Sequence, residues 1–84
     1  MQPAPDRTVF DVITDFLAAD PTSEAILQYR LPGELEERAV QLLERKREDR
    51  LTFDEELEFY DFIRADDMMT LLKAKTRLKL SGKV

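Results

Sequence analysis

The residues of this chain that could do chemistry are almost all carboxylates. The sequence holds 18 Asp and Glu residues and no His or Cys, which excludes a Cys–His nucleophile, a Ser–His–Asp triad and the ordinary zinc sites. A carboxylate metal cluster would need several acids on one interior face, and helical di-iron sites also use His. The acids here instead scatter around a predicted helix. We therefore expect these acids to form a solvated acidic surface. We also expect that the protein binds no metal and no cofactor and is not an enzyme. The densest group of acids is Asp54, Glu55, Glu56 and Glu58.

These acids open the longest uninterrupted segment of the chain, residues 52–80, which contains no Gly and no Pro. As a single helix of about 28 residues it would be roughly 42 Å long. Thr52 is predicted as its N-cap, with Glu55 completing a capping box. Spacing side chains about 100° apart gives one broad apolar stripe, which we expect to face the core. The stripe consists of Phe53, Leu57, Tyr60, Ile63, Met68, Leu71, Ala74 and Leu78.

Three shorter helices are predicted upstream. The first starts after an N-cap at Thr8 and runs to about residue 19, and a short one follows the Pro-containing stretch at residues 20–23. The third starts at Pro32 and ends around residues 48–50. Asp49 is predicted in the left-handed conformation that usually favours Gly.

These elements predict an all-α fold, a small helical bundle. The third helix and the long C-terminal helix would form an antiparallel hairpin, because the connection between them is short. The two N-terminal helices would close this hairpin. The chain would be a single domain over residues 1–84, with frayed tails at 1–6 and 81–84.

Charge is distributed unevenly along the chain. Residues 1–67 carry 18 acidic and 8 basic residues, a net charge of −10, whereas residues 68–84 carry 5 basic residues and no acid. An acidic body disfavours general nucleic-acid binding. The N-terminus does not resemble a signal peptide, and no apolar run reaches the length of a membrane span. We expect a cytoplasmic protein that does not bind membranes, which the absence of Cys also suits.

The basic C-terminal end has three interpretations. Its charges could complement the helix dipole, dock on an acidic surface of a partner or of a second copy, or contact phosphates. They point in several directions around the helix, which disfavours recognition of a nucleic-acid groove. The residues concerned are Lys73, Lys75, Arg77 and Lys79.

A second apolar set lies on the far side of the long helix, formed by Phe59, Phe62, Met69 and Leu80. A helix with two apolar faces must bury both. We expect Phe59, Phe62 and Met69 to mediate self-association as a homodimer about a twofold axis. The alternative is that the first and third helices straddle the long helix and bury Phe59 and Phe62 inside the monomer.

Three stretches, DVITDFLAADPT, LPGELEERAVQLLERKREDRLTFDEE and MMTLLKAKTRLKL, resemble a family of short, uncharacterised, all-helical bacterial proteins common in cyanobacteria. The resemblance covers nearly the whole chain, and LLKAKTRLKL is its most specific part. The chain departs from the family at Asp49, where Gly is expected, and at Phe53, where Pro is usual, which affects the helix ends. The resemblance implies no activity and no catalytic residues. Neighbouring nuclease- or toxin-like genes in the family would imply an antitoxin-like or accessory partner of a co-encoded protein.

Two functions of different classes follow from the sequence. The first is a non-catalytic protein-interaction module that works through the long helix. The second is a small nucleic-acid-binding regulator that uses the basic end. The acidic body favours the first, because a small dedicated DNA-binding protein usually has a basic face.

Overall fold

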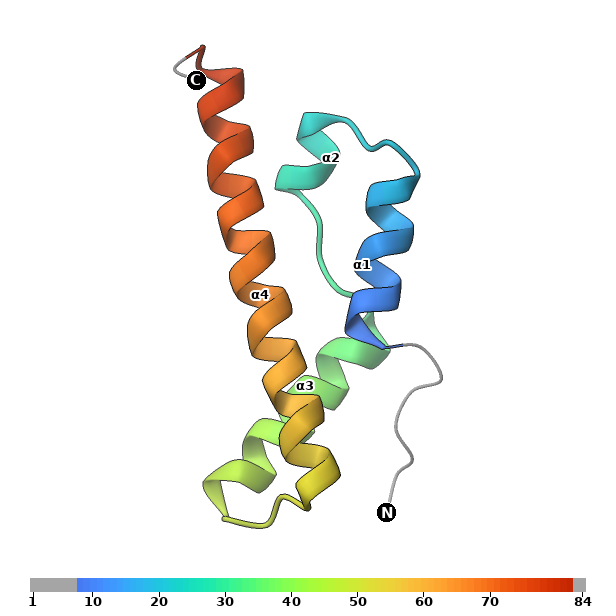
Figure 1. Ribbon diagram of the computed structural model, residues 1–84, viewed down its shortest axis with the longest axis vertical. Coiled ribbons are helices and arrows are strands. Elements are labelled where there is room, and N and C mark those ends of the chain that lie inside the picture. Colours follow the sequence, from blue (N-terminus) through green and yellow to red (C-terminus); the bar gives the residue numbers. More distant parts are fainter. Residues whose placement is uncertain (1–7, 83–84) are drawn as a thin grey trace.

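The structure is a computed structural model that describes residues 8–82, and this part of the chain forms four α-helices. The molecule is elongated, 47 × 23 × 17 Å, and its longest helix spans most of that length (Figure 1). The prediction of a small all-α protein is confirmed. The expected tail at residues 1–6 lies outside the described residues, as do residues 83 and 84, while Ser81 and Gly82 form a turn. The helices are α1 (Val9–Ala18), α2 (Ser23–Leu27), α3 (Gly33–Arg47) and α4 (Phe53–Leu80).

Side-chain caps begin three of the helices. Thr8 and Asp11 form a capping box at α1, and Thr52 and Glu55 form one at α4. Each box satisfies two backbone N–H groups that the helix itself leaves without a partner. Thr22 accepts a hydrogen bond from the backbone N–H of Ala25 and so caps α2. The N-cap predicted from sequence at Thr8 and the capping box predicted at Thr52 are thus confirmed.

The end of α3 is a Schellman-type turn. The backbone N–H of Arg50 donates to the carbonyl of Arg45 at 2.8 Å, and that of Asp49 donates to Lys46 at 3.0 Å. Asp49 has φ 58°, the left-handed conformation predicted for it. The turn gives the carbonyls of Arg45 and Lys46, near the end of α3, a hydrogen-bond partner, and it directs the chain into α4 after only five residues, 48–52.

The long helix is the element on which the others pack, since α1, α2 and α3 all contact α4. In Figure 1, α1 and α2 lie beside the upper part of α4, and α3 crosses its lower part obliquely. The three helices α1, α3 and α4 supply one continuous core. Leu42 and Leu35 are almost completely buried there. Phe16 and Tyr29 stack with ring centroids 4.3 Å apart and so join α1 to the turn after α2. The core residues are Val9, Val12, Ile13, Leu35, Leu42, Phe62, Ala65 and Met69.

The face that α4 turns to the core is not the one expected from the sequence. Phe62 is 8% exposed and Met69 is 7% exposed, whereas Phe53, Leu57 and Leu71 of the expected stripe are largely exposed. The hydrophobic pattern shows that α4 has two apolar faces, but it does not say which one the other helices cover. Ala65, which is fully buried, marks the covered face, because a small side chain lets a neighbouring element approach closely.

Candidate interaction site on the long helix

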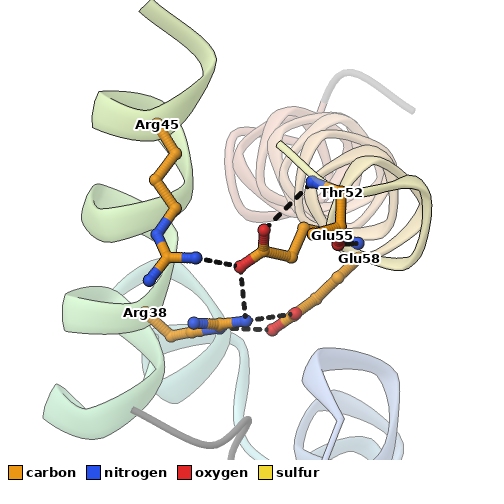
Figure 2. A network of polar contacts seen from close by, with 5 residues as sticks. All are labelled: Arg38, Arg45, Thr52, Glu55 and Glu58. Atoms are coloured by element: carbon orange, nitrogen blue, oxygen red, sulfur yellow. Dashed lines mark hydrogen bonds and ion pairs between the residues drawn. The ribbon is translucent and has the colours of Figure 1, made fainter. Parts of the chain in front are cut away.

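A network of charged side chains connects α3 to the start of α4 (Figure 2). Arg38 of α3 donates two hydrogen bonds of 2.8 Å to the carboxylate of Glu58, from Nε to Oε2 and from Nη2 to Oε1. Its Nη2 also lies 3.6 Å from Oε2 of Glu55, which accepts a hydrogen bond from Nη1 of Arg45. The other oxygen of Glu55 accepts from the backbone N–H of Thr52 at 3.1 Å. Both carboxylates therefore bond to partners within the fold.

The electrostatics of this network favour the charged forms of Glu55 and Arg38. The pKa of Glu55 lies below its usual value, first because its carboxylate accepts the backbone N–H of Thr52 and then because Arg45 and Arg38 lie nearby. The hydrogen bond to Glu58 raises the pKa of Arg38, against the opposing effect of burial. The lowered pKa of Glu55 favours its charged form. The network fixes the rotation of α4 about its axis and is a structural element.

The remaining acids do not converge. Among residues 8–82, no three side chains of His, Cys, Asp or Glu lie close enough together to hold a metal ion. In the same part of the chain, no helix is both long and apolar enough to cross a membrane.

A depression of about 230 Å³ lies between α1, α4 and the loop after α2. Its lining includes core residues such as Ile13, Phe62 and Met69, with Lys73 at its edge. Nζ of Lys73 donates to the backbone carbonyl of Tyr29 at 2.9 Å. A ligand site usually presents a few converging polar groups in an apolar pocket. Here both lining cations already have partners, Lys73 the carbonyl of Tyr29 and Arg30 the carboxylate of Glu36, so the depression is better described as a gap at the rim of the core.

The sequence-predicted interface residues lie on the covered side of α4. Phe62 and Met69 belong to the core, and Phe59 packs against it, with Nζ of Lys46 5.9 Å from the centre of its ring. This arrangement is the alternative considered from the sequence, with Phe59 and Phe62 inside the monomer. It corrects the expected interface at Phe62 and Met69, which are buried in the folded chain, while Phe59 is partly buried.

The four basic residues near the C-terminal end of α4 divide into two groups. Lys73 is half-buried and holds the carbonyl of Tyr29, so it joins the long helix to the turn after α2. Lys75, Arg77 and Lys79 are exposed. The basic end of the helix therefore presents three of the four predicted charges to solvent.

An exposed apolar surface runs along α4 on the side opposite the core. Phe53 is 74% exposed, Tyr60 58% and Leu71 57%. Together with neighbours at alternating spacings of four and three residues they form one stripe within an arc of about 100°. We call this stripe the α4 seam. It consists of Phe53, Leu57, Tyr60, Arg64, Asp67, Leu71, Ala74 and Leu78, all of them exposed.

Sequence reasoning found most of the seam but assigned it to the core and passed over Arg64 and Asp67. Arg64 and Asp67 were the signal in the sequence that this stripe is exposed. Charged side chains are almost never fully buried unless they are paired, and they occupy the middle of an otherwise apolar stripe. A stripe interrupted in this way is more typical of an exposed face that meets another molecule.

Comparison with known proteins adds no functional information, since no protein-family model, curated protein or solved structure matches this chain.

Proposed function

We propose that this protein is a non-catalytic protein-interaction module that binds its partner through the α4 seam. The observation that carries the proposal is the exposure of Phe53, Leu57, Tyr60, Leu71 and Leu78, each at least half exposed and all on one helix face. Scattered apolar residues on a surface need no explanation, but a contiguous apolar stripe typically marks an interaction site. An amphipathic helix face of this kind binds another helix or a groove that accepts one.

The contrast between the two faces of α4 supports the same proposal. One face of the helix holds α1, α2 and α3, and the opposite face holds none of them. The second face is not needed for the monomer core, yet it carries aromatic and aliphatic side chains whose exposure to water costs free energy. A partner that covers the seam would recover that free energy.

The alternative, a small nucleic-acid-binding regulator, has less support. Lys73 is bound to the carbonyl of Tyr29, so three exposed cations remain near the end of α4. The first 67 residues carry a net charge of −10 and would repel phosphates over most of the surface.

The test is affinity capture from a native lysate with and without nuclease, using three baits. The baits are the wild type, Leu71→Glu in the seam and Val40→Glu on α3. Leu71 and Val40 are 57% and 54% exposed, so the two changes introduce the same charge at equally exposed apolar positions. We expect a stoichiometric protein with the wild type and with Val40→Glu, lost with Leu71→Glu. Equal capture by all three baits, or material that disappears on nuclease treatment, would contradict the proposal.

A further inference from the structure

We propose that the partner of the α4 seam is a second copy of this chain, and that the two long helices pair antiparallel as a coiled coil. This inference rests on the proposed function, because it names the molecule that covers the same face. The seam positions alternate in steps of four and three residues from Phe53 to Leu78 without a break. That alternation is the heptad spacing of coiled coils, and it continues here for more than three heptads.

One register makes the seam complementary to itself. In an antiparallel pair whose twofold axis passes between Ala65 and Asp66, every seam position meets another seam position of the second copy. The outer layers are then entirely apolar. From the ends inward they pair Phe53 with Leu78, Leu57 with Ala74, and Tyr60 with Leu71, each layer occurring twice by symmetry.

The central layers of this register pair opposite charges. Arg64 of each copy lies opposite Asp67 of the other, and both side chains are exposed in the monomer. A slip of one heptad in either direction would instead place Arg64 against Tyr60 or Ala74, so that neither Arg64 nor Asp67 would meet an opposite charge in the seam. A parallel pair would stack Arg64 on Arg64 and Asp67 on Asp67. Charge therefore selects both the orientation and the register, as polar residues at coiled-coil core positions commonly do.

The residues flanking the seam agree with the same register. Asp54 lies beside Lys75 of the second copy, and Glu56 lies beside Arg77 of the second copy, each pair occurring twice. All four side chains are exposed in the monomer. The acidic start and the basic end of α4 are thus brought together from different copies. Such flanking pairs add little affinity, but they set partner choice and orientation.

The rest of the fold leaves this face accessible. The core residues Phe62, Ala65 and Met69 lie on the side of α4 opposite the seam. In Figure 1, α1 and α2 both lie on one side of the long helix, and its other side carries no element along the upper half. A second copy can therefore approach along the seam without displacing α1 or α2.

The first experiment measures mass by light scattering on a size-exclusion column, with circular dichroism to confirm folding. We expect the wild type to elute with twice the mass of one chain at about 100 µM. An interface of standard size typically keeps two copies together at this concentration. Arg64→Glu and Asp67→Arg should each raise the dimer dissociation constant at least tenfold, because each places like charges in the central layers. An equimolar mixture of these two variants should regain the wild-type dissociation constant, since the mixed pair restores opposite charges.

The second experiment determines the relative orientation of the two long helices by disulfide formation. Only the introduced Cys residues can react, because the chain has no Cys of its own. Leu57→Cys and Ala74→Cys are prepared separately, mixed and oxidised. The antiparallel register predicts the mixed disulfide between position 57 of one copy and position 74 of the other. Disulfides joining 57 to 57 and 74 to 74 would show parallel pairing and overturn the proposal.

The remaining outcomes separate this inference from the proposed function. A folded wild type that stays monomeric at about 100 µM overturns the second copy as partner, as does a variant mixture that stays monomeric. If Leu71→Glu nevertheless abolishes capture of another protein, the seam remains an interaction site with a different occupant. If Leu71→Glu changes neither mass nor capture, both proposals fail.

Discussion

Arg38 and Glu58 are 20 residues apart in the chain and share two hydrogen bonds of 2.8 Å, side by side, between α3 and α4. Paired contacts of this geometry fix direction as well as distance, because two nitrogens of the guanidinium, Nε and Nη2, must face the two oxygens of the carboxylate. The pair sets how far α4 is rotated about its own axis. It thereby determines which apolar face of α4 is covered and which remains exposed.

Arg38→Ala should destabilise the fold by about 3 kcal/mol, because it removes the buried partner of a partly buried pair and leaves Glu58 and Glu55 without their shared cation. Chemical denaturation followed by circular dichroism measures the loss. The control is Arg30→Ala, which removes an exposed ion pair with Glu36 whose arginine side chain is 81% exposed. The control should change the free energy of unfolding by less than about 0.5 kcal/mol. Equal losses of unfolding free energy in the two variants would show that the Arg38–Glu58 pair stabilises the fold no more than an exposed ion pair does.

Stability should fall on acidification in a way that depends on Glu55. The folded-state pKa of Glu55 lies below its usual value, so the unfolded chain binds the proton more readily. The stabilisation is therefore fully present above the unfolded pKa, near 4.5, and is lost as the pH falls through the lower folded value. Denaturation midpoints from pH 7 to pH 3 test this. In Glu55→Gln the decline should be shallower than in the wild type, and an equal decline in the two proteins would contradict the role given to Glu55.

Asp49→Gly should raise the free energy of unfolding by about 0.5 kcal/mol, because Gly adopts the left-handed conformation of this position without a Cβ penalty. The gain is small, since Gly also makes the unfolded chain more flexible. Asp49→Ala is the matching variant, and it should be destabilising because it keeps the Cβ and loses the polar side chain. Thermal melts that ranked Ala above Gly would contradict the turn geometry.

The two faces of α4 should respond in opposite ways to truncation. Phe62→Ala should cost about 3–5 kcal/mol, because it opens a cavity in a small core. Tyr60→Ala should cost less than about 1 kcal/mol when measured at a concentration where the chain is monomeric, since this ring is 58% exposed. Urea denaturation at low micromolar protein gives both values. A larger cost at Tyr60 than at Phe62 would mean that the assignment of the faces is reversed.

Local features of this fold could be predicted from the sequence, because their causes are local. Thr52 and Glu55 are three residues apart and act on the same helical turn, so their pattern is sufficient to locate the start of α4. The left-handed residue at Asp49 follows in the same way from a helix that ends just before a new cap. The length of α4 follows from the absence of Gly and Pro in its interior.

The covered face of α4 could not be predicted, because its causes are not local. The choice depends on which Glu of α4 meets Arg38, and the sequence offers many acids and several arginines. The bond from Lys73 to the carbonyl of Tyr29 spans 44 residues, and a backbone acceptor has no sequence signature. The prediction of the interface depended on the same choice of face. Because the stripe that begins at Phe53 was assigned to the core, Phe59, Phe62 and Met69 were assigned to the surface.

The packing of three helices on α4 also affects when the fold can form during synthesis. Val9 and Ile13 leave the ribosome about 50 residues before Phe62 and Met69, against which they finally pack. At ordinary elongation rates that gap lasts roughly 3–10 s. Throughout this interval α1, α2 and α3 lack the helix that each of them contacts, so the nascent chain carries its apolar residues without a core to receive them. Translation speed through the codons of α4 should therefore influence how much of this protein reaches the folded state.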